Sequence, residues 1–140
     1  LSGIFSHTIN DPTNQLFRGF DDVFHAPHSR HTEVRGEDIA KIPTLEILAE
    51  SDEAGVLVAG TLDGRSMFIT GHLEYDRDTL DAEYRRDVAK GMEIAPPAHY
   101  YPGDDVTRPP LVSWRAHAHL FYSNWLNYCV YQVTPYRFED

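Results

Sequence analysis

The alternation of apolar and polar residues predicts strands in the middle of the chain. Residues 44–50 (TLEILAE) alternate, and residues 56–59 and 66–70 form two further apolar runs. The dipeptide Asp63-Gly64 lies between those two runs, and it is a strong hairpin signal because its residues accept the positive φ of a tight turn. We therefore expect three strands between residues 45 and 70.

The period then changes to that of helices. Between Asp78 and Lys90 the apolar residues recur every four positions and give one helical face, and Gly91 follows as the expected C-terminal exit. A second helix is expected from Ser113, as its cap, to about Tyr128. Its apolar residues lie on one stripe that we assign to the core, namely Trp114, Ala118, Phe121, Trp125 and Tyr128.

Two other stretches are rich in turn signals, and the second of them is expected to be mostly loop. The first 35 residues are punctuated by turn-forming residues such as Asn10-Asp11-Pro12, and residues 93–110 are rich in proline. Strands followed by helices indicate an α/β or α+β domain.

Length and charge narrow the class of protein. The 140 residues suffice for one domain, and 12 basic against 22 acidic residues give a net charge of −10. Because binding to a phosphate backbone depends on Lys and Arg, we expect no nucleic-acid partner. No apolar run approaches the roughly 18 residues of a membrane span, so no membrane partner is expected either. The chain begins at Leu1 rather than a methionine, and we expect it to be part of a longer gene product.

The cysteine content bears on the compartment and on the nucleophile. The one cysteine, Cys129, excludes an internal disulfide and fits a reducing compartment, for which we expect the cytoplasm. It lies in the aromatic segment NYCVYQ, where burial raises a thiol pKa and makes the thiol inert. No Gly-x-Ser-x-Gly pattern marks a serine nucleophile.

The segment Thr70–Asp76 carries the most informative chemistry. It lies between an apolar strand and a helix, where open α/β sheets place their active sites. In extended backbone His72 and Glu74 project to the same side, and a carboxylate beside an imidazole supports a general base. A solvated loop pair is the alternative that this spacing leaves open. If the pair is catalytic, the chain holds the base half of a site without its nucleophile.

The histidines also raise the question of a metal. His25, His28 and His31 recur every three residues, but Pro27 opposes a regular helix there. No histidine grouping has the partner spacing of a zinc motif, so no metal site and no cofactor is expected.

Several stretches together resemble a known family. They are APHSRHTEVR (26–35), LEILAES (45–51), ITGHLEYDRDTL (69–80), YRRDV (84–88) and SWRAHAHLFYSNWLNYCVYQVTPY (113–136). In this order they are similar to the C-terminal half of the homoserine O-acyltransferases, the family of homoserine O-succinyltransferase and O-acetyltransferase. The resemblance implies half of a flavodoxin-like α/β fold, a three-layer sandwich related to class I glutamine amidotransferases. Residues 1–140 would then be the C-terminal part of a single acyltransferase domain.

The resemblance also implies a reaction and roles. The family transfers an acyl group from acyl-CoA, through a cysteine thioester, to the hydroxyl of L-homoserine in methionine biosynthesis. By this resemblance His72 is the general base and Glu74 orients it. Arg86 binds the homoserine carboxylate, Glu83 meets its ammonium group, and Ser29 lies at the substrate site. Acetyl-CoA or succinyl-CoA is the co-substrate, and HTEVR after PHSR resembles the acetyl-using members more.

Two departures from the family pattern matter. Leu73 stands where the motif Gly-His-Pro-Glu-Tyr-Asp has proline, which frees φ between the two catalytic side chains. The family's nucleophilic cysteine and a substrate-binding lysine belong to the N-terminal half, which is absent here. We expect that half as a partner, an unpaired strand edge in its absence, and a homodimer. A glutamine amidotransferase-like hydrolase and a non-catalytic binding domain of the same fold are the alternatives.

Overall fold

The computed structural model describes residues 1–135, and a five-stranded antiparallel sheet forms their centre. The strand order is β2-β1-β3-β4-β5, with each neighbouring pair antiparallel. The strands are β1 (Ser2–Ile9), β2 (Val23–Ser29), β3 (Leu45–Ser51), β4 (Gly55–Thr61) and β5 (Met67–Ile69).

The three strands expected between residues 45 and 70 are confirmed as β3, β4 and β5. The Asp63-Gly64 turn joins β4 to β5 as expected: Gly64 has φ of +71°, and its N–H donates to the Thr61 carbonyl at 2.9 Å. Local turn chemistry therefore determines this hairpin.

The turn-rich first third, in which the sequence predicted no strand, contains two long ones. β1 and β2 pair along almost their whole length, from Ser2 opposite Ser29 to Thr8 opposite Val23. The hydrophobic pattern did not predict these strands, because the polar residues His7 and His28 interrupt it although both are fully buried. The predicted turns lie between the two strands, around the 3₁₀ turn η1 (Gln15–Phe17).

Three α-helices accompany the sheet: α1 (Gly36–Ile39), α2 (Thr79–Ala89) and α3 (Arg115–Asn124). The helix expected at 78–90 is confirmed as α2. After its last residue, Ala89, and the cap Lys90, Gly91 has φ of +77°, and hydrogen bonds run from Gly91 N to Val88 O and from Met92 N to Asp87 O. These two bonds form a Schellman motif. Within residues 1–135 no helix is long and apolar enough to cross a membrane.

The second predicted helix is confirmed with a different start and end. α3 begins after Trp114 rather than at Ser113, whose hydroxyl instead bonds His25 Nδ1 at 2.9 Å. It continues into a π-helical segment, η3 (Trp125–Tyr131). The first part of the predicted stripe is buried, whereas Trp125 is 39% exposed. The proline-rich stretch is loop, as expected, apart from the short turn η2 (Pro102–Asp104).

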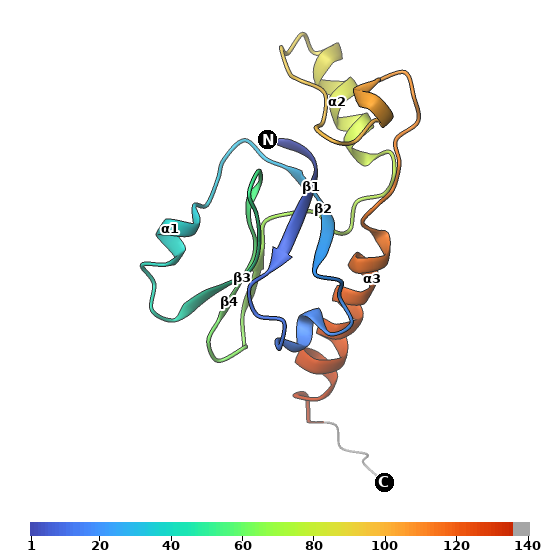
Figure 1. Cartoon of the computed structure of the whole chain (residues 1–140). Helices are drawn as coiled ribbons and strands as arrows, with labels where there is room; N and C mark the ends of the chain where they lie inside the picture. Colours follow the sequence, from blue (N-terminus) through green and yellow to red (C-terminus); the bar gives the residue numbers. More distant parts are fainter. Residues whose placement is uncertain (136–140) are drawn as a thin grey trace.

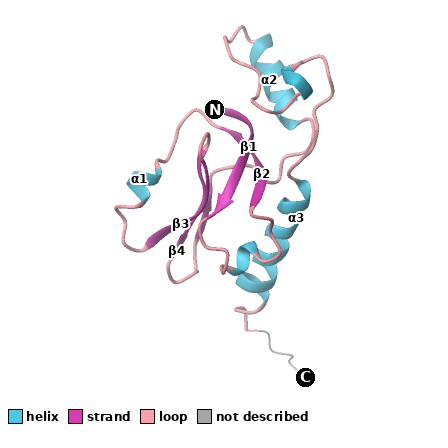
Figure 2. Ribbon diagram, in the orientation of Figure 1, coloured by secondary structure: helices cyan, strands magenta, loops and turns pink. Residues whose placement is uncertain are grey.

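Helices pack against different parts of the sheet (Figures 1 and 2). α3 lies beside β2, and its Ala118 and Phe121 join the main core together with Trp114, the residue just before the helix. α1 packs against β3 and contributes Ile39 to a smaller cluster with Val56. α2 lies beyond the edge of the sheet at which β1 begins and β2 ends (Figure 1). This mixed helix and strand arrangement is compatible with an α/β fold, and the flavodoxin-like, three-layer sandwich stays a prediction.

The sheet is curled, and one hydrogen bond joins segments from its opposite edges. β2 and β5 end the strand order, yet the N–H of His72, just after β5, donates to the Pro27 carbonyl in β2 at 2.9 Å. Gly71 lies at this contact. A Cβ there would lie 2.5 Å from Leu57 Cδ1 and 2.8 Å from the Pro27 oxygen. The missing side chain therefore lets the two edges meet.

We expect Gly71→Ala to lower the free energy of unfolding by about 1–3 kcal/mol, because the added methyl group overpacks a backbone contact. Urea denaturation of the chain measures this. Gly36→Ala is the matched control, since the atoms nearest its added methyl group are the side-chain methyl groups of Ile47 and Val56. Equal stability of the two variants would contradict the steric account.

His7 and His28 are the buried polar groups of this part of the core. Their exposed fractions are 1% and 0%, and their Nε2 atoms lie 2.9 Å apart. Burial lowers the pKa of His7 to about 4, with the neighbouring charges of His25 and Arg30 adding to the effect. Burial, then His7 and Arg30, lowers the pKa of His28 to about 3. Both rings are therefore neutral in the folded protein at neutral pH.

This burial predicts sensitivity to mild acid. Below pH 6.5 the unfolded histidines bind protons that the folded ones do not, so the free energy of unfolding falls as the pH drops from 6.5 towards 4. Two such groups give a slope of up to about 2.7 kcal/mol per pH unit. Urea denaturation at pH 7.0, 6.0 and 5.0 measures it. Stability that stays constant over this range would contradict the prediction.

Candidate active site

His72 and Glu74 meet in a tight turn directly after β5. His72 Nδ1 lies 2.9 Å from Glu74 Oε1, and the turn closes through a hydrogen bond from Tyr75 N to His72 O at 3.1 Å. The side chains therefore converge through a turn, and not through the extended backbone that the i, i+2 spacing suggested. Leu73, between them in the sequence, is buried in the main core and anchors this turn to it.

The hydrogen bond to Glu74 determines which imidazole nitrogen can react. An ionised carboxylate only accepts hydrogen bonds, so Nδ1 of His72 carries the proton. Nε2 then has a free lone pair and can accept a proton from a substrate hydroxyl. The carboxylate also stabilises the imidazolium that such a transfer forms. The pair therefore has the geometry of a general base.

Tyr75 connects this pair to the first turns of α2, and the sequence reasoning gave it no role. Its ring stacks on the His72 imidazole with centroids 4.4 Å apart and an interplanar angle of 7°. Its hydroxyl donates to Glu83 Oε1 at 2.7 Å. Burial, followed by the contact with Glu83, raises the pKa of Tyr75 to about 12, so the hydroxyl stays a donor. No sequence spacing pointed to this contact, because it depends on how the turn packs against the helix.

Ser29 and Glu83 come together from distant segments. The Ser29 hydroxyl, at the end of β2, donates to Glu83 Oε2 at 2.8 Å. With Tyr75 on the other oxygen, both carboxylate oxygens of Glu83 are held by neutral donors. A carboxylate fixed in this way keeps its negative charge available to a cation.

A cavity of about 470 Å³ lies between the end of β2, α2 and the loop after α2, and neither His72 nor Glu74 lines it. Ser29, Tyr75, Glu83 and Arg86 all contribute to its wall. Arg86 is about half exposed, and its Nε pairs with Asp87 Oδ1 at 2.8 Å, which raises the pKa of the guanidinium further. A carboxylate and a guanidinium in one cavity suit a small molecule that carries an ammonium and a carboxylate.

Other sequence candidates lie elsewhere. Cys129 lines a separate groove between η3 and the hairpin of β4 and β5, and burial raises the pKa of its thiol. His25 bonds Ser113, and His28 is fully buried, so the spaced histidines do not converge on one point. Residues 1–135 contain no cluster of three or more His, Cys, Asp or Glu side chains able to hold a metal ion.

Comparison with protein families decides the relationship. Residues 1–136 match the family model described as homoserine O-succinyltransferase. This chain belongs to the homoserine O-succinyltransferase family. The match extends to Tyr136, which lies outside the described residues, and it confirms the resemblance based on the sequence motifs.

Relatives within this family carry a related name. The chain is 64% identical over 136 residues to a homoserine O-acetyltransferase of Brevibacillus brevis, covering 97% of this chain and 44% of the relative. It is 58% identical over 140 residues to homoserine O-acetyltransferases of Thermotoga petrophila and Bacteroides thetaiotaomicron, covering all of this chain and 46% of each relative. The chain therefore spans slightly less than half the length of these relatives.

Proposed function

We propose that this chain supplies the general base and the amino-acid site of a homoserine O-acyltransferase that works in methionine biosynthesis in the cytoplasm. The supporting observation is the cavity that brings Ser29, Glu83 and Arg86 together, with Tyr75, which stacks on the His72 imidazole, in its wall. L-Homoserine fits its charges: the ammonium group faces Glu83 and the carboxylate faces Arg86. The hydroxyl then extends towards Nε2 of His72.

The proposed reaction has two stages. Nε2 of His72 takes the proton of a cysteine thiol, and the thiolate attacks the carbonyl carbon of acyl-CoA. A thioester forms, the C–S bond to CoA breaks, and CoA leaves as a thiol with that proton from His72. In the second stage Nε2 of His72 takes the hydroxyl proton of homoserine, and the oxygen attacks the thioester carbonyl. The C–S bond breaks, and the thiolate of the cysteine is restored. Glu74 keeps the imidazole oriented throughout and stabilises its protonated form.

The cysteine belongs to the proposed N-terminal half rather than to this chain. Cys129 has a raised thiol pKa and lines a different groove, so it does not suit this role. β5 is an outer strand of the described sheet, which fits a sheet that extends further in the complete domain, and its Phe68, 53% exposed, leaves apolar surface for the N-terminal half to cover. We propose that both halves form one flavodoxin-like, three-layer domain, and that the enzyme is a homodimer.

For the acyl donor we propose acetyl-CoA over succinyl-CoA. The three relatives described above are named homoserine O-acetyltransferase. The family model has the succinyl name, so the donor has to be measured directly. We propose no further cofactor for this reaction.

A hybrid enzyme tests the base. In it, this chain replaces the segment that it matches in the Brevibacillus brevis relative. We expect His72→Gln to slow transfer to homoserine by about 10²- to 10⁴-fold, while intact-mass analysis still detects the acylated cysteine. His99→Gln is the matched control, because His99 makes an equivalent 2.9 Å contact with Glu53 at the surface. Normal turnover of the His72 variant would exclude His72 as the base.

The same hybrid distinguishes the alternatives. Glutamine hydrolysis without any response to homoserine would indicate an amidotransferase-like hydrolase. No heat on titration with homoserine, together with no release of CoA from acetyl-CoA, would indicate a non-catalytic binding domain. Acetyl transfer to homoserine contradicts both.

Two adjacent arginines on α2 test the amino-acid site. Arg86 lines the cavity, whereas Arg85 pairs with Asp81 and the Val106 carbonyl. We expect Arg86→Ala to raise the KM for homoserine about 10- to 100-fold, since a hydrogen-bonded charge is lost. Arg85→Ala should leave the KM within about twofold. Equal effects of the two substitutions on the KM would exclude Arg86 from the site.

A further inference from the structure

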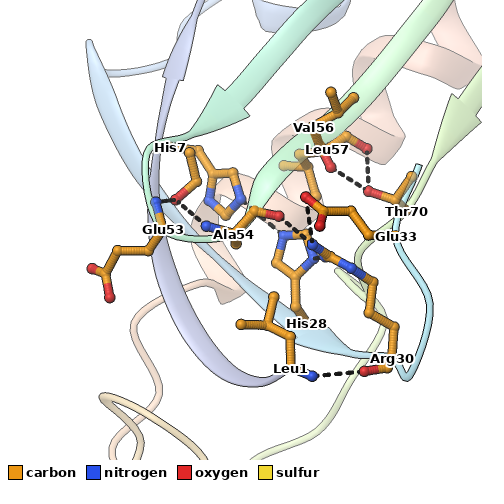
Figure 3. Close-up of polar contacts among 11 residues, drawn as sticks. Leu1, His7, His28, Arg30, Glu33, Glu53, Ala54, Val56, Leu57 and Thr70 are labelled. Atoms are coloured by element: carbon orange, nitrogen blue, oxygen red, sulfur yellow. Dashed lines mark hydrogen bonds and ion pairs between the residues drawn. The ribbon is translucent and has the colours of Figure 1, made fainter. Parts of the chain in front are cut away.

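The two buried histidines form a chain of hydrogen bonds with a single direction (Figure 3). Arg30 Nη1 lies 2.6 Å from His28 Nδ1, and a guanidinium can only donate, so His28 Nδ1 accepts. The proton of the neutral His28 ring is then on Nε2, which donates to His7 Nε2 at 2.9 Å. His7 in turn carries its proton on Nδ1 and donates to the Phe5 carbonyl at 2.9 Å. Each ring therefore has one allowed tautomer.

Arg30 is itself held in place at the start of this chain. Its second terminal nitrogen donates to the Ala54 carbonyl, and Glu33 lies 4.0 Å from the same nitrogen. The guanidinium is therefore bound on the side away from His28 as well. Figure 3 shows the His28 ring between this guanidinium and the His7 ring.

Both chain neighbours of His28 touch the candidate active site. The Pro27 carbonyl accepts the hydrogen bond from His72 N, and the Ser29 hydroxyl donates to Glu83. The His28 ring itself packs behind the base: its Cε1 would lie 3.4 Å from a Cβ on Gly71. The side chain that anchors this end of β2 therefore determines the position of two contacts, one to the base and one to the amino-acid cavity.

We propose that His28, held by Arg30 and His7, is a positioning residue for the base His72. The inference rests on the proposed function. An apolar side chain could fill this space in more than one rotamer, whereas a ring bonded at both nitrogens has one orientation. That orientation fixes the Pro27 carbonyl and the Gly71 backbone, and with them the direction in which Nε2 of His72 points. His28 contacts no substrate and exchanges no proton in the reaction.

The first test uses the unmodified chain. Two-bond ¹⁵N–¹H correlation spectra distinguish the two neutral tautomers of each histidine. We expect a protonated Nε2 on His28 and a protonated Nδ1 on His7, unchanged from pH 7.5 to 5.5. The opposite tautomer on either ring, or protonation of His28 within this range, would overturn the proposal.

The second test separates positioning from folding. His7→Gln keeps an oxygen that can accept from His28 Nε2, whereas His7→Leu fills the space without an acceptor. We expect the hybrid enzyme with His7→Gln to keep at least half of the wild-type kcat for transfer to homoserine, and His7→Leu to lose about tenfold or more. Formation of the acyl-cysteine should slow in His7→Leu as well, since His72 also protonates the CoA leaving group, and should stay within about twofold in His7→Gln. Equal kcat values for the two variants would overturn the proposal.

The third test measures the tautomer of His72 directly. His28→Phe keeps the ring shape and removes both nitrogens, and His25→Phe on the same strand is the matched control at an exposed position. In the unbound chain we expect His28→Phe to lower the fraction of His72 with a protonated Nδ1, and His25→Phe to leave it unchanged. No change in His72 in a folded His28→Phe chain would overturn the proposal. If His28→Phe does not fold, the His7 pair decides.

These tests also separate this inference from the proposed function. A hybrid that acylates homoserine through His72, yet loses no kcat in His7→Leu, contradicts the positioning role alone. A hybrid without acyltransferase activity contradicts the proposed function. The tautomers and the response of His72 in the unbound chain then still decide whether His28 positions this imidazole.

Discussion

The hydrogen bond from His72 N to the Pro27 carbonyl is the contact on which the rest of this structure depends. It closes a curled sheet by joining a segment after its last strand to the strand at its other edge. It requires Gly71, because a side chain at that position would occupy the space of Leu57 and Pro27. Together with the stacking of Tyr75 on His72, this contact fixes the imidazole relative to the cavity beside α2.

The sequence predicts the parts of this fold that depend on local patterns. The hairpin at Asp63-Gly64 and the helix that Gly91 follows can be predicted from turn chemistry and periodicity, and both are present. β1 and β2 could not be predicted in the same way. Their histidines, His7 and His28, look like exposed polar positions in the sequence. Burial of these rings is favourable only because they form hydrogen bonds with residues far along the chain or on the neighbouring strand.

The candidate site, too, could be predicted only in part from the sequence. The spacing of His72 and Glu74 suggests their contact, and the family resemblance indicates Ser29, Glu83 and Arg86. Neither indicated Tyr75, whose contacts with His72 and Glu83 depend on the packing of a turn against a helix. The hydrogen bonds of His28 depend on Arg30 and on a residue 21 positions away, so a single sequence does not show them either.

Tyr75 has one more consequence, because it touches the imidazole with its ring and Glu83 with its hydroxyl. A ligand that draws the Glu83 carboxylate towards itself also disturbs the surface on which the imidazole rests. Thermodynamic reciprocity then applies: if occupancy of the cavity changes the proton affinity of the imidazole, protonation of the imidazole changes ligand affinity by the same factor. Through the phenol ring of Tyr75, ligand binding in the cavity and protonation of the His72 imidazole become coupled equilibria.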